Sequence, residues 1–454
     1  MAPGFGSDTL VFRIAPIIRD KVEKIVTAPQ QADSVLRRFY ENREYRTAWL
    51  GSDVADRQRT QALAILRQAS DEGLSPSVYR PDWLASSFQS AHDPSELAEI
   101  DIRLTEALFR YMRDVRLGSP TRQARAAALD PDVASFDFQE ALAKALTADK
   151  LVDFLHSLPP QYREYKSLKT ALLQYRTRPD ADPQRLQQIM LNMERWRWMP
   201  RTLGPAFVMV DIVAAKLWVV EDGRTVLTSP VIVGKPATPT PIMRGTASGV
   251  TVNPYWNVPL SIARNEILPK LRTDRLYLKS HDIVIRSGAP DDPYGLGIDW
   301  KSVSRRDFPF QFRQEPGPGN ALGQLKLELD SPFSVYLHDT PERAAFARTN
   351  RYLSHGCVRV KEIKQLAAIA LSGKPQTDLA MLNTAIDAGD TKTYPLGAPL
   401  PVYLLYWTAT AQDNGAVEFR RDVYGYDRVL VGELASQPPV NKNTTAVAEV
   451  ACRE

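Results

Sequence analysis

Cysteine is almost absent from this sequence, which has only Cys357 and Cys452 in 454 residues. Two cysteines cannot form the disulfide framework of a small secreted domain, and a chain of this length can bury large cores without one. Cys357 lies in a patterned region, whereas Cys452 lies in a polar tail. Because a bridge between the two would block a reactive thiol, we interpret Cys357 as a residue kept for chemistry.

Long apolar segments are also missing. No stretch approaches the roughly 18 apolar residues of a membrane-spanning helix, so we predict no membrane insertion. The N-terminal segment is interrupted by Asp8 and Arg13. It has no basic region followed by the uninterrupted apolar core of a signal peptide, and we therefore expect a mature or trimmed N-terminus.

The chain lacks an excess of either charge. Lys and Arg total 57, Asp and Glu total 53, and the net charge is +4. This charge is too small and too spread out for a nucleic-acid-binding surface, so we predict no nucleic-acid partner. It is compatible with a weak attraction to an anionic polymer.

The first part of the chain has helical periodicity. Between residues 97 and 115 apolar side chains recur at steps of three and four, and Gly118 and Pro120 end the pattern. Weaker periods of the same kind occur at 33–48, 57–71 and 161–176. Together they predict a helical domain.

A further helix is indicated by Asp182 as its N-cap and Pro183 in its first turn. It ends in the sequence ERWRWMP at 194–200, which has the composition of an aromatic binding site. Trp and Met at helical spacing are more often core residues, so we predict that this segment packs at a domain junction.

From about residue 205 the period changes to that of strands. Short runs rich in Val and Ile follow one another, with Asp222-Gly223 placed as a hairpin turn. More strands are predicted in VTVNPYWNVP, LKLEL, FSVYLHD and PVYLLYWTATA. A helical piece and a Pro- and Gly-rich stretch interrupt this rhythm at 264–323, which we interpret as a lid inserted close to the active face.

These patterns predict an α+β protein in which a helical domain precedes a mainly β domain. In chain order we expect a loosely ordered N-terminal segment, the helical domain, the β domain with its lid, and a flexible tail. The predicted boundaries are 1–32, 33–200, 201–435 with the lid at 264–323, and 436–454.

His338 lies in the predicted strand FSVYLHD. Strand alternation sends Phe333, Val335 and Leu337 to one face. His338 therefore shares the other, more polar face with Tyr336. In this segment alone, a hydrogen-bonded structural histidine is as good an interpretation as a catalytic one.

Cys357 follows His338 in the string SHGCVRV, where Gly356 permits an unusual backbone turn. Amides around such a turn can point into one pocket, beside the nucleophile. A free thiol is mostly protonated at neutral pH, so its chemistry requires an imidazole that takes or shares the proton. Only His338 and His355 are close enough in sequence to do this.

Two other interpretations of Cys357 are weighed against a nucleophile. By residue type alone, a lone cysteine in a β-rich core is most often a small apolar residue. A zinc site formed with His338 and His355 would need a fourth ligand, and none occurs at metal-site spacing. We therefore predict a thiol nucleophile and no metal.

At these residues the sequence resembles the L,D-transpeptidase family, whose YkuD-type catalytic domain has a histidine followed by a Ser/Thr-His-Gly-Cys motif. The matching positions are His338, Ser354-His355-Gly356-Cys357 and Arg359. Other segments are similar to the larger, lid-bearing, YcbB-like branch: VGKPATPTP, NPYWNVP, ILPKL, PGPGNALG, VYLHDTP and LLYWTA. The resemblance covers roughly 194–430, and weakly the helical region from 33, which is similar to a scaffold domain.

The resemblance implies a two-step acyl transfer in the bacterial cell wall, without a cofactor, in the periplasm or cell envelope. Cys357 attacks the bond between a diamino acid and D-alanine in a peptidoglycan stem peptide, and an amine of an acceptor stem then takes the acyl group. His338 acts as base and then as acid, oriented by the backbone carbonyl of Asp339. The amides of Gly356 and Cys357 stabilise the oxyanion.

Six further residues are candidates for substrate binding. Arg359 follows Cys357 by two positions, so it points to the same side, where it could grip a carboxylate. An ordinary surface arginine is the alternative. The others are His355, Ser354, Tyr336, Trp256 and Tyr255.

In one respect the chain departs from this branch, because no peptidoglycan-binding module is recognisable between 118 and 190. Binding of the substrate would then depend on the lid and the helical domain. The expected product is a cross-link between two third residues, with a link to a first residue as the alternative. A thiol hydrolase of the same fold and a non-enzymatic envelope-binding protein are the two competing hypotheses.

Overall fold

A computed structural model describes residues 7–25, 31–118, 129–130, 135–289, 291–331, 333–372 and 375–435. The chain divides into two compact units. One consists of Met1–Arg201 with Thr408–Glu454, and the other of Thr202–Trp407. The predicted helical domain followed by a mainly β domain is confirmed.

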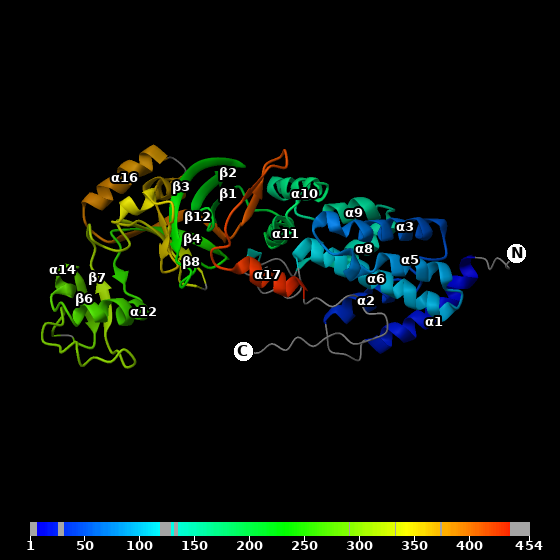
Figure 1. Ribbon diagram of the computed structural model, residues 1–454, viewed down its shortest axis with the longest axis horizontal. Helices are drawn as coiled ribbons and strands as arrows, with labels where there is room; N and C mark the ends of the chain where they lie inside the picture. The colour runs from blue at the N-terminus through cyan, green and yellow to red at the C-terminus, as the bar shows by residue number, and fades with distance from the viewer. Residues whose placement is uncertain are drawn as a thin grey trace. The chain divides into compact units, whose positions relative to one another are not determined.

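The first unit is formed mainly by helices (Figure 1). These are α1 (Ser7–Ile25), α2 (Gln31–Glu41), α3 (Asp53–Arg67), η1 (Gln68–Glu72), α4 (Pro76–Tyr79), α5 (Pro81–Ser90), α6 (Pro94–Leu117), α8 (Phe138–Thr147), α9 (Leu151–Ser157), α10 (Arg163–Arg176), α11 (Pro183–Arg197) and α17 (Tyr426–Ala435).

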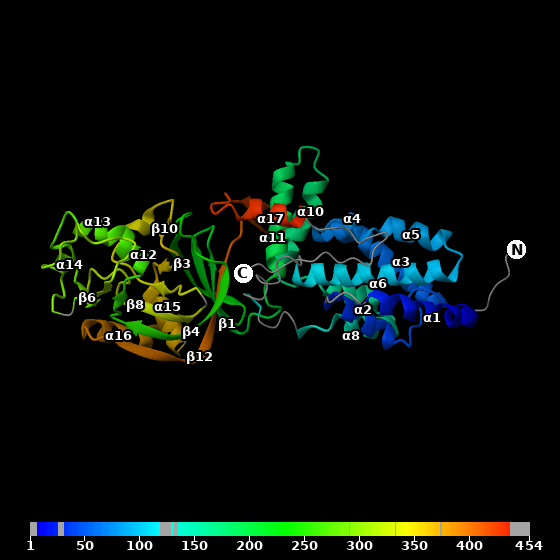
Figure 2. The ribbon, with the colours of Figure 1, turned by 90° about the horizontal axis from the view of Figure 1, so that it is seen from below.

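The long helix α6 is central to this unit. Its N-terminus is capped by the Asp93 carboxylate, which accepts a hydrogen bond from the Ser95 amide at 2.8 Å. It contacts α1, α3, α4, α5, α8 and α11, several of which run beside it in Figure 2. Its buried face is the apolar stripe that the sequence predicts between 97 and 115, and the helix ends before Gly118 as expected.

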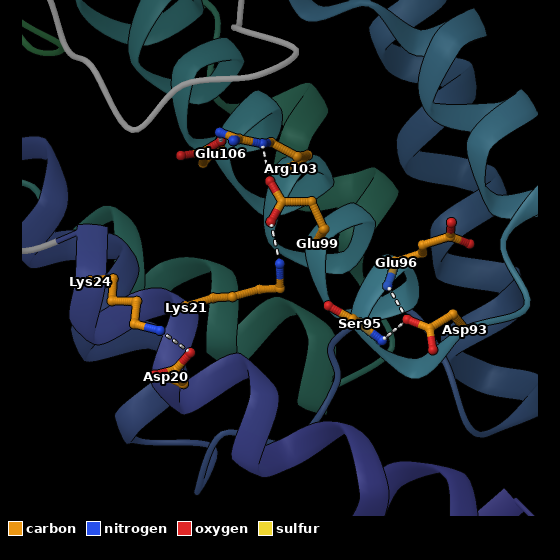
Figure 3. A network of polar contacts seen from close by, with 9 residues as sticks. All are labelled: Asp20, Lys21, Lys24, Asp93, Ser95, Glu96, Glu99, Arg103 and Glu106. Atoms are coloured by element: carbon orange, nitrogen blue, oxygen red, sulfur yellow. Dashed lines mark hydrogen bonds and ion pairs between the residues drawn. The ribbon is translucent and has the colours of Figure 1, made fainter.

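Helix α1 differs from the sequence-based expectation. We expected residues 1–32 to be loosely ordered, but Ser7–Ile25 forms a helix whose Ile14, Ile18 and Val22 are buried in the core. An ion pair of 3.0 Å between Lys21 and Glu99 also ties α1 to α6 (Figure 3). The steps of four between the three buried residues are a helical signal that the interruption by charged residues obscured.

Asp101 of α6 is a fully buried polar anchor in this unit. Its carboxylate accepts hydrogen bonds from the Tyr40 hydroxyl at 2.7 Å and from the Ala48 and Trp49 amides at 3.0 and 2.9 Å. The Trp49 indole in turn donates to Thr105 at 2.9 Å. The loop after α2 is thereby held against α6, because each buried polar group has a partner.

The aromatic end of α11 is buried. Trp196, Trp198 and Met199 are buried, and Asp182 caps the helix by accepting from the Gln184 amide at 2.8 Å. The same unit includes a hairpin of β13 (Ala409–Ala411) and β14 (Val417–Phe419), together with α17. Residues 408–435 therefore belong with the helices, and not with the β domain to which we assigned them.

The second unit is built on a mixed sheet. Its strands are β1 (Ala206–Asp211), β2 (Lys216–Glu221), β3 (Arg224–Gly234), β4 (Met243–Val252), β8 (Leu325–Asp330), β9 (Leu337–His338), β10 (Tyr352–Ser354), β11 (Val358–Val360) and β12 (Lys392–Leu405). Their order is β10-β3-β11-β9-β8-β4-β12-β1-β2. Since β2 also pairs with β3, the sheet closes on itself. Both β9 and β11 have a paired strand on each side.

Besides the lid, which is described below, this unit has η5 (Arg343–Ala347), α15 (Ile363–Ser372) and α16 (Pro375–Asp387). Helix α15 contacts β4, β8 and β12, and α16 packs on α15. The hairpin turn predicted at Asp222-Gly223 joins β2 to β3.

The strand that carries His338 is shorter than predicted. Only Leu337–His338 pairs in the sheet. Ser334 has a φ of 51°, so its backbone is left-handed and interrupts the extended run. Phe333 is consequently exposed instead of facing the core, whereas Val335 and Leu337 are buried as the alternation requires.

The lid forms a small lobe of its own, visible in Figure 1 around α12, α14, β6 and β7. Its elements are β5 (Trp256–Asn257), α12 (Leu260–Ile262), the π-helix η4 (Ala263–Ile267), α13 (Leu268–Leu271), α14 (Tyr277–Ser280), β6 (Ile283–Ser287) and β7 (Gln311–Gln314). Its sheet has the order β5-β7-β6, and Leu268, Trp300 and Phe312 lie in its separate core. Because β5 pairs with β7, the lid begins at Trp256, earlier than the predicted residue 264.

In the described parts of the chain, no helix is both long enough and apolar enough to span a membrane. The predicted tail at 436–454, with Cys452, lies outside the described residues.

Candidate active site

The pairing of β9 with β11 defines the face of the candidate site. The two strands run parallel, with Leu337 opposite Val358 and His338 opposite Arg359. Leu337 and Val358 are fully buried and point into the core. By alternation, His338 and Arg359 point to the opposite face, and Cys357, two residues before Arg359, is on that face too.

The turn before Cys357 is fixed by side chains. Gly356 has a φ of 117°, which confirms the unusual backbone turn predicted there. The Thr240 hydroxyl donates to the Gly356 carbonyl at 2.8 Å, and the Ser354 hydroxyl donates to the Cys357 carbonyl at 2.6 Å. Because these hydroxyl donors are buried, the turn that presents the thiol is rigidly supported.

This arrangement changes two expectations. The Gly356 amide donates to the Ser354 hydroxyl at 3.2 Å, so it is already engaged and does not join an oxyanion hole in this arrangement. The amide of Cys357 is the better candidate donor. Ser354 is buried and its hydroxyl donates to the Cys357 carbonyl, so within this turn it supports the backbone at Cys357.

His338 is held in one orientation. Its Nδ1 donates a hydrogen bond of 2.6 Å to the backbone carbonyl of Asp339, the contact that the resemblance implies. With the proton on Nδ1, the basic nitrogen of the neutral ring is Nε2. His338 is only 4% exposed, so its ring is protected from bulk water.

Asp339 is itself fixed by its side chain. One carboxylate oxygen pairs with Arg343 at 2.9 Å, and the other accepts from the Gln324 amide at 3.0 Å. Gly323 lies against this side chain so closely that an added Cβ would be 2.5 Å from the Asp339 Cβ. The position of the Asp339 carbonyl, which orients His338, therefore depends on Gly323, where the chain leaves the lid.

Burial and the charge of Arg359 lower the pKa of His338 from 6.5 to about 4. Its backbone hydrogen bonds with Asp339 and Leu322 act in the opposite direction and are outweighed. The imidazole is therefore neutral throughout the neutral range and is able to accept a proton.

Burial raises the pKa of the Cys357 thiol above its ordinary value, although a backbone hydrogen bond with Tyr336 and the charges of Lys326 and Arg359 oppose this. Thiol and imidazole are both neutral at rest. In such a pair a thiol can react only as it passes its proton to a base, and the neutral imidazole of His338 is able to accept a proton.

Arg359 is already paired. Its Nη1 lies 2.6 Å from the Glu342 carboxylate, on the turn that follows β9. The Arg359 side chain is 19% exposed and the Glu342 side chain 69% exposed. The guanidinium thus lies at the edge of the site with one carboxylate ligand on its solvent side.

A cavity of about 380 Å³ lies between the lid and this edge of the sheet. Residues of the lid that line it include Trp256, Glu266 and Lys270, and the sheet contributes Glu342, His355 and Arg359. The lid is linked to the sheet by an ion pair between Glu266 and His355 Nε2, which is also 3.2 Å from Lys235 Nζ. Charged groups of both signs thus line the cavity, and two of its lining residues, His355 and Arg359, flank Cys357 in the sequence.

A family profile described as the L,D-transpeptidase catalytic domain matches residues 205–377, and one described as a scaffold domain matches residues 34–172. A protein of Haemophilus influenzae named "Putative L,D-transpeptidase" is 31% identical over 402 residues, which are 88% of this chain and 79% of that relative. The chain belongs to the L,D-transpeptidase family.

Solved structures of L,D-transpeptidases are similar to parts of the chain. One from Mycobacterium smegmatis is 15% identical over 44% of this chain, with a TM-score of 0.19, and a mutant from Enterococcus faecium is 14% identical over 46%, with a TM-score of 0.19. The matches span 58% and 52% of those two chains.

The aromatic candidates of this L,D-transpeptidase are in three different settings. Trp256 lines the cavity below the lid. Tyr255 is exposed and stacks under the Arg313 guanidinium at 4.1 Å, whereas the Tyr336 ring lies 4.0 Å below Lys326 Nζ. Only Trp256 is therefore placed by the structure in the cavity.

Three residues of the site have no signature in the sequence. Glu342 and Glu266 reach the site from a turn and from the lid, so their contacts depend on loop geometry. Gly323 was recognised only as part of the Pro- and Gly-rich stretch. The one available signal was the position of Glu342, four residues beyond His338.

Proposed function

We propose that this L,D-transpeptidase forms peptidoglycan cross-links through a cysteine acyl-enzyme. The observation that carries the proposal is that Cys357 shares one face with His338, whose Nδ1 is fixed by the Asp339 carbonyl at 2.6 Å. The substrates are stem peptides of the cell wall, so the enzyme acts in the periplasm or cell envelope. No cofactor takes part.

In the first step, Cys357 Sγ attacks the carbonyl carbon between the diamino acid and D-alanine of the donor stem. The thiol proton moves to His338 Nε2, and the Cys357 amide stabilises the oxyanion. When the C–N bond breaks, His338 returns the proton to the leaving amine of D-alanine. The acyl group remains on Sγ as a thioester.

In the second step, the amine of an acceptor stem attacks the thioester carbon. His338 takes the proton of this amine, the C–S bond breaks, and the proton returns to Sγ. The new amide joins the third residue of the donor to the acceptor, and we favour the third residue of the acceptor as the site of attachment. Arg359 binds a carboxylate of the stem.

The test is incubation with purified disaccharide-tetrapeptide, followed by mass spectrometry of the products. Cross-linked dimers with release of D-alanine support the proposal, and fragmentation of the dimers identifies the linked residues. A mixture of tripeptides and D-alanine without dimers would show a hydrolase of the same fold.

Acylation by a carbapenem tests the nucleophile separately. We expect a mass increase on the wild-type protein and none on Cys357→Ala, because the thiol forms the covalent bond. A folded wild-type protein without an adduct would favour a non-enzymatic, wall-binding role. Muropeptide analysis of treated cell walls then reports the reaction and the bond type together.

A further inference from the structure

Among the described residues, Glu342 is the carboxylate that pairs with Arg359. The two side chains are 2.6 Å apart, and both residues line the cavity. The Arg359 side chain is held beside the sheet, whereas Glu342 lies on an exposed turn before η5. A largely buried guanidinium loses stability without a partner, so a carboxylate is needed there whenever no substrate is bound.

We propose that Glu342 is a specificity-determining residue that occupies Arg359 in place of a stem-peptide carboxylate and is displaced when that carboxylate binds. The inference rests on the proposed function, in which Arg359 grips the donor. It adds a competing group within the protein, which the substrate must replace.

The geometry makes this exchange easy. Glu342 is 69% exposed, so its side chain can turn into water without becoming a buried, unpaired charge. Its backbone amide stays anchored to the Thr340 hydroxyl at 3.3 Å, and the turn need not move. Arg359, only 19% exposed and opposite His338, remains where it is.

The exchange selects for charge. A substrate carboxylate replaces the carboxylate of Glu342 with a group of the same charge, and the surroundings of His338 keep their electrostatic balance. A carboxamide of the same shape brings no charge, so it cannot compete with Glu342 for the guanidinium. Glu342 thereby raises the discrimination between free and amidated stems.

Two carboxylates of the donor could make this contact, that of the terminal D-alanine and that of the diamino acid side chain. The experiment therefore uses three donors: the free tetrapeptide, one with a carboxamide at the diamino acid, and one with a carboxamide at the D-alanine terminus. D-alanine, or its amide from the third donor, is measured as it is released by the wild-type protein and by Glu342→Gln.

We expect Glu342→Gln to lower KM for the free donor by about two- to fivefold, the range for an exposed ion pair, with kcat changed less than about twofold. The donor whose relevant carboxylate is amidated should show no change in KM. Whichever amidated donor loses the response identifies the carboxylate that Arg359 binds.

Glu418→Gln is the matched control. Glu418 pairs with Arg420 at 2.6 Å, with exposed fractions of 66% and 20% that nearly equal those of the Glu342 pair, and it lies in the first unit. It should leave KM unchanged for all donors. The second comparison introduces Glu342→Gln into Arg359→Gln, where it should have no effect on KM, because the competition requires the guanidinium.

If the wild-type protein releases D-alanine but Glu342→Gln has an unchanged or raised KM for the free donor, the inference about Glu342 is overturned and the proposed function is not. An equal fall in KM with all three donors has the same consequence. If the wild-type protein neither releases D-alanine nor is acylated by a carbapenem, the proposed function itself fails. The two failures are therefore distinguishable.

Discussion

His338 lies directly opposite Arg359 in the parallel pairing of β9 with β11. A base and a permanent cation thus share one face, and the charge of Arg359 adds to burial in lowering the pKa of His338. The same charge acts on Cys357 in the direction that favours the thiolate. The charge of Arg359 therefore acts on the pKa of both residues of the proposed proton transfer.

This pair predicts that the rate of acylation falls only at an unusually acidic pH, which we call the acidic limit. In the proposed mechanism the active base is neutral His338, so activity should fall as the pH drops through its pKa of about 4 and not near 6.5. Since Arg359 lowers that pKa, Arg359→Gln should move the acidic limit upward. The measurement is the pH dependence of kcat for D-alanine release at saturating donor; a wild-type limit near 6.5, or a downward shift in the variant, contradicts the prediction.

The turn at Gly356 gives a second prediction. An alanine at a φ of 117° is strained by about 1–3 kcal/mol, although its Cβ would meet nothing closer than the Pro239 carbonyl oxygen at 3.7 Å. Gly356→Ala should therefore relax the turn, displace Cys357 and lower the rate of carbapenem acylation at least tenfold. Gly397→Ala, on β12 with open space around it and no positive φ, is the control. Equal acylation rates in the two variants would show that the turn does not position the thiol.

The sequence was sufficient where local rules decide the structure. Helix α6 is predictable from the period of its apolar residues and from the glycine that follows it. Helix α11 is predictable from its N-cap residue. The polar face of His338, opposite the buried Leu337, follows from alternation along its own strand. These features depend on neighbouring residues, which is why they were predictable.

The features that the sequence did not predict depend on contacts between segments that are distant in the chain. Glu266 meets His355 across 89 positions, and no local period encodes where the lid places it. The left-handed Ser334 shortened a strand that the alternation alone extended. The assignment of 408–435 to the helical unit likewise depends on where the chain packs and not on its strand pattern.

The ion pair between Glu266 and His355 predicts how the lid is held closed. Both side chains are partly exposed, so Glu266→Gln should weaken the closed state by no more than an exposed ion pair does. Hydrogen exchange of the amides of η4 should accelerate roughly two- to fivefold. Glu315→Gln removes a pair with Arg313 that lies within the lid itself, and η4 should exchange at the wild-type rate in this control. Identical exchange in the two variants would mean that Glu266 does not hold the lid.

Asp101 predicts the stability of the helical unit. Asp101→Ala leaves the Tyr40 hydroxyl and the Ala48 and Trp49 amides buried without their acceptor, which should cost about 2–5 kcal/mol in the free energy of unfolding. Asp93→Ala, which removes only the exposed cap of the same helix, should cost about 1 kcal/mol. Denaturant unfolding of the full chain followed by far-UV circular dichroism compares the two. Equal losses would show that the buried contacts contribute no more than a helix cap.

The contact of Gly323 with Asp339 links the end of the lid to His338, the proposed base. An alanine Cβ at position 323 would lie 2.5 Å from the Asp339 Cβ, so the Asp339 backbone must shift, and its carbonyl moves away from His338 Nδ1. A displacement of this kind should reduce kcat for D-alanine release by roughly tenfold or more. Because the hydrogen bond to Asp339 raises the pKa of His338, its loss should also move the acidic limit of kcat below the wild-type value.

Gly389→Ala separates this effect from simple backbone strain. Gly389 has a φ of 78°, close to the 62° of Gly323, but an added Cβ there would contact nothing within 4 Å. Both variants should therefore lose a similar stability, about 1–2 kcal/mol, from the left-handed backbone, with any further loss in Gly323→Ala due to the contact with Asp339. Only Gly323→Ala should lower kcat and shift its pH limit. A parallel loss of activity in the two variants would mean that Gly323 contributes to folding alone, and that the orientation of His338 does not depend on the end of the lid.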